Sequence, residues 1–328
     1  MYKISDFLAE LERSAYTKPG ELSLRPTFSE PPKWERWAIR DINPLSGQKK
    51  VRMLTVPNEA LRFLHKGLIY LLRVSKKASS ALHYARGARP GFSHQRLVSE
   101  HRGNRFFYVV DLKDAYSQVD HSLMIKIVIE FLRAIPHFEA FSEEDEAGVT
   151  IFLERYFLLP EIPGLPVGLP ASPDLFNAYI GTLVNWRISK MISAGHYTHY
   201  LDDLVFSFRS RPSRKKRREI RETLKQWRLP INHGKCQFKD LKKGPIVITG
   251  IGLEYGGRMF IPRNYTRKIA GLVHRALETR DPHEIARARG MVGLVLHTLK
   301  VARQVPNQHE EKLLRSFRKL QDDPENNR

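Results

Sequence analysis

The pattern of hydrophobic and polar positions changes its period several times along the chain, which predicts a mixture of strands and helices. Residues 34–40 and 49–57 have the character of strands. The intervening residues 41–48 are rich in Asn, Pro, Ser and Gly, so a β-hairpin is expected. Residues 58–79 are expected to form a helix. Residues 104–111 form a short apolar run that ends at an acid, which is typical of a buried strand.

Two more helices are predicted in the middle of the chain. Residues 120–135 form a hydrophobic stretch for which Asp120 is a suitable N-cap. The second helix, residues 172–192, follows a segment rich in Pro and Gly. Ser172 suits its N-cap and Pro173 its first helical position. Three side chains of this helix are spaced to share one face: Leu175, Tyr179 and Leu183.

The next apolar segment, residues 196–208, predicts a hairpin with Asp202 and Asp203 at its turn. One face of its second strand is formed by Leu204, Phe206 and Phe208. A very basic helix, a short hairpin around residues 252–262 and a basic helical tail complete the chain. Because the strands are few, short and interleaved with helices, we expect the α+β fold class rather than a long parallel sheet.

The charge of the chain narrows its possible partners. The 328 residues include 55 Lys and Arg against 35 Asp and Glu, a net charge of +20, and the 41% of hydrophobic residues is enough for a packed core. The positive excess indicates a polyanionic partner, because neutralising phosphates releases condensed counterions. By itself, the excess fits DNA, RNA or an anionic membrane surface.

Membrane insertion and export are not expected from the sequence. No apolar run approaches the roughly 20 residues that span a bilayer. Residues 1–16 look amphipathic but lack the apolar core and cleavage site of a signal peptide. Cys236 is the only cysteine, so the sequence predicts neither an internal disulfide nor a zinc knuckle. We therefore expect a cytoplasmic protein.

The carboxylates at the ends of the predicted strands are the candidate catalytic groups. Two adjacent aspartates in a turn are common and need no function. Asp111, however, ends another apolar strand, and if the two strands are neighbours it joins Asp202 and Asp203 at one sheet edge. Hard cations such as Mg²⁺ prefer oxygen ligands, and two of them about 4 Å apart activate a hydroxyl and stabilise a leaving pyrophosphate. In so basic a chain, these acids indicate phosphoryl transfer on nucleic acid.

Five motifs, in order, carry a resemblance to reverse transcriptases. "VVDLKDAYSQVD", "GLPVGLPASPDLFNAY" and "HYTHYLDDLVFSF" resemble the three central palm motifs of that family, and "LPINHGKCQF" and "VITGIGLEYGGRMFIPR" resemble the two that follow. The similarity runs from about Trp37 to about Arg275. It implies a right-hand polymerase fold. In that fold an N-terminal extension and fingers would occupy residues 1–105, the palm 106–255 (with 121–165 partly fingers) and a helical thumb 256–328.

The resemblance also implies roles for the acids and their neighbours. Asp111 and Asp202 would bridge two Mg²⁺ ions, Asp203 would be the more peripheral third carboxylate, and Leu112 belongs to the same metal-binding set. Tyr116 matches the aromatic gate that packs under the nucleotide sugar and disfavours a 2′-hydroxyl. Without the flanking motif, Tyr116 would be interpreted as a core aromatic.

Four further residues match positions that contact the deoxynucleotide. Val167 and Gly168 fall in the segment that lines the nucleotide and template, although many relatives have Gln where this chain has Val167. Lys235 matches a lysine near the leaving phosphates, where a cation neutralises pyrophosphate. Arg52 resembles the arginine that grips the triphosphate, and Arg40 is a weaker candidate. In so basic a chain, each of these cations is alternatively an ordinary surface charge.

Two basic regions and three histidines have simpler interpretations. Residues 209–221 contain eight basic residues in thirteen and are expected to form a solvated helix face on the palm. The C-terminal cations are better placed for a thumb that holds the duplex: Arg263, Arg267, Lys268, Arg275 and Arg280. The histidines near the acids are interpreted as packing or surface residues: His196, His199 and His233.

The resemblance predicts an RNA-directed DNA polymerase that copies a partner non-coding RNA and forms an RNA/DNA duplex. It also predicts that the protein acts in a bacterial retron or a related phage-defence system, with a possible toxin or effector protein as a partner. His101 falls where the Asn-Ala-x-x-His motif of retrons ends, but Leu97 and Val98 occupy the Asn-Ala positions. The subfamily therefore stays open. Two alternatives also stay open: a protein-primed or template-independent polymerase, and a relative that binds RNA without catalysis.

Overall fold

A computed structural model describes residues 30–42, 49–136, 142–192 and 195–321, so the prediction for residues 1–16 lies outside the described residues. The chain forms two compact units. Unit 1 comprises residues 1–89, 112–191 and 218–232, and unit 2 comprises residues 90–111, 192–217 and 233–328. No helix of the described part is long and apolar enough to cross a membrane.

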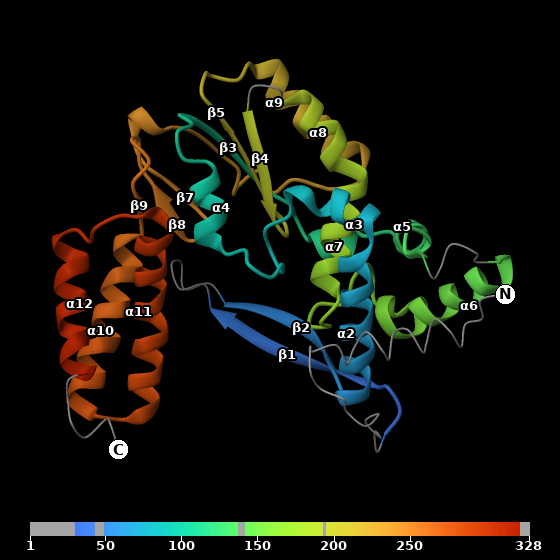
Figure 1. Cartoon of the computed structure of the whole chain (residues 1–328), viewed down its shortest axis with the longest axis horizontal. Coiled ribbons are helices and arrows are strands. Elements are labelled where there is room, and N and C mark those ends of the chain that lie inside the picture. Colours follow the sequence, from blue (N-terminus) through green and yellow to red (C-terminus); the bar gives the residue numbers. More distant parts are fainter. Residues whose placement is uncertain (1–29, 43–48, 137–141, 193–194, 322–328) are drawn as a thin grey trace. The chain divides into compact units, whose positions relative to one another are not determined.

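Unit 2 is built on a four-stranded antiparallel sheet in the order β4-β5-β3-β6. Figure 1 labels three of these strands, β3, β4 and β5. Its strands are β3 (Phe106–Asp111), β4 (Gly195–Tyr200), β5 (Asp203–Phe208) and β6 (Gln237–Asp240). Every residue of β3 is buried, because the strand has a partner on each side and is rich in apolar side chains. The β-strand predicted from the run that ends at Asp111 is confirmed.

The remaining elements of unit 2 surround a hydrophobic core that extends from β3 to the C-terminal helices. These elements are α4 (His94–Glu100), β7 (Ile246–Ile248), β8 (Ile251–Leu253), β9 (Met259–Phe260), α10 (Arg263–Thr279), α11 (Pro282–Ala302) and α12 (Gln308–Gln321). Helices α10, α11 and α12 pack side by side as a bundle, and α11 also contacts α4 (Figure 1). The predicted short hairpin and basic helical tail are both present.

Unit 1 combines a two-stranded hairpin with helices. Its elements are β1 (Trp34–Ile42), β2 (Lys49–Pro57), α2 (Glu59–Val74), α3 (Lys76–Ala81), the 3₁₀ turns η1 (Leu82–Tyr84) and η2 (Ala115–Gln118), α5 (His121–Arg133), α6 (Glu143–Leu153), α7 (Ser172–Ile180) and α8 (Trp186–Met191). Two π-helical segments, η4 (Glu154–Leu158) and η5 (Gly181–Asn185), interrupt the helices, and α9 (Arg214–Gln226) runs across the boundary of the units.

Several local predictions are confirmed, and others are corrected. Asp120 caps α5, since its side chain accepts a hydrogen bond from the Leu123 amide. The helix expected over residues 58–79 breaks at Ser75, which caps α3 and donates its hydroxyl to the Phe131 carbonyl. Ser172 is not an N-cap: it lies inside α7, and its hydroxyl donates to the Pro166 carbonyl. The α+β class is confirmed, with short antiparallel sheets and helices.

Candidate active site

The sheet of unit 2 brings two of the predicted acids together. Asp111, the last residue of β3, pairs in the antiparallel register with Asp203, the first residue of β5. Asp202 lies in the turn between β4 and β5, after Leu201, whose φ of 54° is left-handed. A leucine in that region is strained by about 1 kcal/mol or more, so the flanking strands must hold this turn. The predicted convergence of strand-end acids is therefore observed for Asp111 and Asp203.

The three carboxylates repel one another. The pKa of Asp203 is raised to about 7, first by burial and then by the charges of Asp202 and Asp111, against a lowering contribution from Lys235. The Nζ of Lys235 lies 3.0 Å from Oδ1 of Asp111, and this hydrogen bond raises the pKa of the lysine. A cluster of this kind favours any further cation that reaches it.

A pocket of about 410 Å³ opens at this cluster. Its lining consists of Val109, Asp111, Asp203, Gly234, Lys235, Gln237, Val247 and Thr249. Within the described ranges, no group of three or more His, Cys, Asp or Glu side chains is assembled as a closed metal site. The donor chemistry still fits a hard cation, because the side chains of Asp111 and Asp203 offer only oxygen atoms and lie opposite each other at one edge of the sheet. Leu112 follows directly and forms an isolated β-bridge with Ile231.

Unit 1 contains Tyr116, Val167, Gly168 and Arg52, which are predicted to contact the nucleotide. The ring of Tyr116 stacks on Phe176 with 4.9 Å between centroids. The Tyr116 carbonyl accepts a hydrogen bond from the Leu165 amide at 2.8 Å. Gly164 has a φ of +69°, and a Cβ there would overlap the same carbonyl, so glycine is required. Tyr116 is therefore fixed both by its ring and through the loop that precedes α7.

The same loop is attached to strand β2. The Thr55 amide donates to the Val167 carbonyl at 2.7 Å. Gly168 has a φ of +111°, and a Cβ there would lie 2.6 Å from the Thr55 carbonyl oxygen. Arg52 is exposed on β2, three residues before this attachment, and pairs in register with Ile39. The predicted nucleotide residues thus belong to one unit, while the carboxylates and Lys235 belong to the other.

A buried histidine that the sequence analysis did not single out supports this loop. His65 of α2 is fully buried. Its Nε2 lies 3.0 Å from the Tyr156 carbonyl, to which it must donate, and its Nδ1 accepts from the Ala171 amide at 3.2 Å. The two bonds fix one neutral tautomer. Burial accordingly lowers the pKa of His65 to about 4. The histidine holds both ends of the segment that contains Val167 and Gly168.

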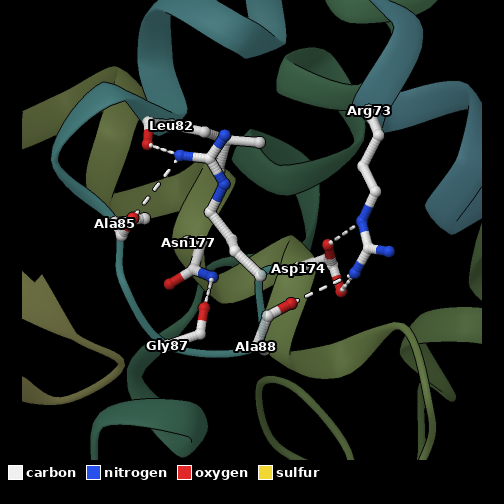
Figure 2. Close-up of polar contacts among 8 residues, drawn as sticks. Arg73, Leu82, Ala85, Gly87, Ala88, Asp174 and Asn177 are labelled. Carbon is white, nitrogen blue, oxygen red and sulfur yellow. Dashed lines mark hydrogen bonds and ion pairs between the residues drawn. The ribbon is translucent and has the colours of Figure 1, made fainter. Parts of the chain in front are cut away.

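A second network missed by the sequence analysis ties the loop after η1 to α7 (Figure 2). Arg73 forms an ion pair with the buried Asp174 at 3.1 Å and donates to the Ala88 carbonyl. Asn177 donates to the Gly87 carbonyl at 2.8 Å. Burial raises the pKa of Asp174, although Arg73 lowers it in part. No short motif marks this network, because Arg73 and Asp174 are about a hundred positions apart (|i−j| = 101).

The other histidines and the basic segment take part in packing or lie at the surface. Within unit 2, His101 is fully buried, and its two ring nitrogens lie 2.7 Å from the hydroxyls of Ser207 and Thr198. His199 is buried and His233 is exposed. The predicted basic helix begins only at Arg214, and it is amphipathic, with Ile220 and Leu224 buried. The stacking of His94 on Tyr200 at 4.0 Å, at the end of β4 just before the turn that contains Asp202, was not predicted.

Comparison with known proteins identifies the fold. A family model described as "Reverse transcriptase (RNA-dependent DNA polymerase)" matches residues 40–253. A telomerase structure from Candida albicans, in complex with a TWJ fragment of telomeric RNA, has a TM-score of 0.50 at 9% identity, over 88% of this chain and 60% of that one. An apo telomerase from Candida tropicalis, truncated from the C-terminal domain, has a TM-score of 0.50 at 9% identity, over 70% and 55%.

The telomerase likeness shows the fold alone, and it confirms the right-hand polymerase architecture predicted from the sequence. This chain spans 60% and 55% of the lengths of the two telomerase chains. None of the curated proteins compared with it is significantly similar in sequence.

Proposed function

Because this chain belongs to the reverse transcriptase family, we propose that it is an RNA-directed DNA polymerase, a nucleotidyltransferase that adds deoxynucleotides to a 3′-hydroxyl on an RNA template. The observation that carries the proposal is the pairing of Asp111 with Asp203 at the ends of β3 and β5, beside Asp202 in the turn. A protein that only held RNA would gain nothing from three mutually repelling acids.

The metal of the proposed reaction is Mg²⁺, in two sites. Asp111 and Asp202 would hold the ions, with Asp203 as the third carboxylate and Leu112 beside them. Bound magnesium supplies Lewis-acid stabilisation of the attacking and leaving oxygens. The contribution of Lys235 is a positive charge at the same pocket, already within 3.0 Å of Asp111, which suits it to neutralise and protonate the leaving pyrophosphate.

The deoxynucleotide would be positioned by unit 1. The stacking of Tyr116 on Phe176 gives a rigid ring, which is what a steric gate against a 2′-hydroxyl requires. The Gly168 backbone, which no side chain shields, suits close approach of the base pair. Arg52, exposed on β2, suits bidentate contact with triphosphate oxygens. In this account residues 1–105 form an N-terminal extension and fingers, 106–255 the palm and 256–328 the thumb.

The RNA/DNA duplex would be held by the C-terminal helices. Five cations on or next to α10 are exposed: Arg263, Arg267, Lys268, Arg275 and Arg280. A groove of about 500 Å³ between α10 and α12 is lined in part by Arg263, Arg267 and Lys312. Phosphate oxygens along a duplex are the natural partners of such a row of cations, since these contacts recognise backbone and shape.

The biological setting that we propose is a bacterial defence system of the retron kind or a related one. The template would be a cognate non-coding RNA, the compartment the cytoplasm, and the effector a separate toxin or similar protein. Residues 248–263 support this assignment, because they begin with Ile248, Thr249 and Gly250 and resemble the Val-Thr-Gly segment of retrons. The departures at Leu97, Val98 and Val167 leave the subfamily open.

Sequencing of the DNA made by the purified protein tests the function. The protein, a primed RNA of defined sequence, Mg²⁺ and the four deoxynucleotides should give DNA complementary to the RNA. DNA whose sequence is unrelated to the supplied RNA would contradict templated synthesis and identify the chain as a template-independent polymerase.

A further inference from the structure

A second hollow, with a volume of about 400 Å³, lies entirely within unit 1 and shares no residue with the site described above. We call it the Trp186 pocket. Its walls come from α3, η1, α5, η5 and α8. Its lining consists of Lys77, Ser80, Ala81, His83, Tyr84, Phe131, Gly181, Thr182, Asn185, Trp186 and Ser189.

A local departure from helical geometry shapes the floor of the pocket. The π-helical segment η5 separates α7 from α8. At its start, Gly181 lies so close to the Ala81 carbonyl that a Cβ would overlap it. At its end, the buried Asn185 donates its side-chain amide to the same carbonyl at 3.0 Å. π-helical turns are often found at functional sites, because they widen the helix and redirect side chains.

The wall formed by η1 is held in place by buried and half-buried arginines. Arg86 donates to the His83 carbonyl at 2.7 Å, and Arg89 donates to the Leu82 carbonyl at 2.6 Å (Figure 2 shows Leu82). On another side, the Ser75 hydroxyl donates to the Phe131 carbonyl at 2.7 Å. The pocket is therefore largely preformed, so a ligand would lose little affinity to ordering it.

The side chains at the rim combine aromatic rings with hydroxyls. Trp186 is 55% exposed, which is unusual for so large an apolar side chain. The rings of His83 and Tyr84 meet edge to face at 4.8 Å. Three short hydroxyl side chains complete the polar lining: Ser80, Thr182 and Ser189. Aromatic faces beside small hydrogen-bonding groups suit a nucleobase, which stacks and offers polar edges.

The charges around the pocket favour an anion. Lys190 places its Nζ 4.0 Å from the centroid of the Trp186 ring, and the guanidinium of Arg187 lies 6.0 Å from it. None of the described lining residues is acidic. Glu130, which pairs with the lining residue Lys77, is also engaged by Arg133. The guanidinium of Arg187 also donates to the side-chain oxygen of Gln226, which is neutral, so its positive charge, like that of Lys190, stays close to the Trp186 ring and would attract a phosphate there.

We propose that the Trp186 pocket binds an unpaired nucleotide of single-stranded RNA, with the base against the aromatic rim and its phosphate near Lys190 and Arg187. This site would anchor an RNA at a place other than the catalytic carboxylates. An acidic peptide shares the charge but lacks the flat ring that this rim is shaped to stack. Binding at this pocket needs neither metal nor deoxynucleotide, so it is measured separately from polymerisation.

The test uses the full-length chain in EDTA without deoxynucleotides. The probes are fluorescein-labelled ten-nucleotide RNAs, one all adenosine and one all uridine, and binding is followed by fluorescence anisotropy at several salt concentrations.

Trp186→Ala should weaken binding at least about fivefold, since stacking contributes about 1–3 kcal/mol per base. Trp186→Phe should restore most of the loss, and Lys190→Glu should weaken binding and reduce its salt dependence. Tyr70→Ala, which removes a 39% exposed aromatic outside the pocket, is the matched control.

Photocrosslinking locates the bound RNA. A uridine probe that carries 4-thiouridine should crosslink to a peptide containing Trp186 or Tyr84. Affinity for both RNAs within twofold of wild type in Trp186→Ala, with no such crosslink, would overturn the proposal. Trp186-dependent binding of a ten-residue polyglutamate peptide in place of RNA would also overturn it, and would identify a protein-docking site. These two measurements, RNA affinity and crosslinking, do not depend on whether the protein has polymerase activity.

Discussion

Asp111 and Asp203 are cross-strand partners at the last register position of β3 and β5. Directly opposed residues on antiparallel strands lie about 4.5–5.5 Å apart at Cα, where two like charges destabilise the sheet. Burial, and after it the charges of Asp202 and Asp111, raise the pKa of Asp203 to about 7. The repulsion among these carboxylates lowers the stability of the fold at the place where the proposed reaction needs them close together.

Removing one charge of this pair should stabilise the metal-free protein. Asp203→Asn is expected to raise the free energy of unfolding in EDTA by about 1 kcal/mol, because it removes the repulsion without changing the shape of the side chain. Urea unfolding at pH 7.5 measures the change. Asp114→Asn, at an exposed acid three positions after Asp111 in the sequence, should have no such effect. A loss of stability in Asp203→Asn would mean that the carboxylates are satisfied without a metal.

His65 should make the stability of the protein sensitive to acid. Its pKa is about 4 in the folded protein against 6.5 normally, so the unfolded chain binds the proton more readily. The contribution of the neutral imidazole is complete above about pH 6.5 and is lost as the pH falls toward 4. The loss amounts to about 3 kcal/mol. Urea unfolding between pH 7.5 and 4.5 should show this slope.

The matched variant for this prediction is His65→Gln, because a glutamine amide can donate to the Tyr156 carbonyl and accept from the Ala171 amide. Its stability should fall much less between pH 6.5 and 4.5. His283→Gln, at an exposed histidine, should keep the wild-type slope. An unchanged slope in His65→Gln would assign the acid sensitivity to other groups.

Gly168 should tolerate no side chain. Alanine at this position would combine a φ of +111° with a Cβ 2.6 Å from the Thr55 carbonyl. Gly168→Ala is expected to cost about 2 kcal/mol or more in stability and to raise KM for deoxynucleotides. Gly103→Ala is the control, since Gly103 has a φ of +87° but nothing within 4 Å of its Cβ. Equal effects of the two variants would exclude the close approach of Thr55 as the cause.

Tyr116 should set the choice of sugar. Tyr116→Ala is expected to raise incorporation of ribonucleotides relative to deoxynucleotides by about tenfold or more, because the ring that excludes a 2′-hydroxyl is lost. Tyr116→Phe keeps the stack on Phe176 and should preserve the wild-type ratio. Primer extension with competing nucleotides gives the ratio. No change in Tyr116→Ala would leave Tyr116 with the packing role that its contact with Phe176 alone would suggest.

The sequence predicted best those features of the structure that depend on residues close together in the chain. The run before Asp111 and the hairpin around Asp202 are apolar segments that end in acids, and the sheet register brings Asp111 opposite Asp203 as expected. Asp120 caps its helix because the capping bond is made within three residues. Such features depend on neighbours in the chain.

Features that depend on distant partners were not predictable. His65 bonds to carbonyl and amide groups 91 and 106 positions away, and nothing near His65 in the sequence marks these contacts. Ser172 has the residue type of an N-cap, but a bond to the Pro166 carbonyl draws it into the first turn. The π-helical segment at Gly181 depends on close contact with Ala81, a hundred residues earlier (181 against 81).

Primer extension on an RNA template by the Asp202→Asn/Asp203→Asn double variant measures whether Asp111, Asp202 and Asp203 catalyse RNA-templated DNA synthesis. Incorporation of deoxynucleotides should fall by about a thousandfold or more, since several kcal/mol of transition-state stabilisation are lost. Unfolding in EDTA should show a stability at least equal to that of the wild type. Asp114→Asn should extend the primer normally. Undiminished extension by the stable double variant would show that Asp202 and Asp203 do not catalyse the reaction.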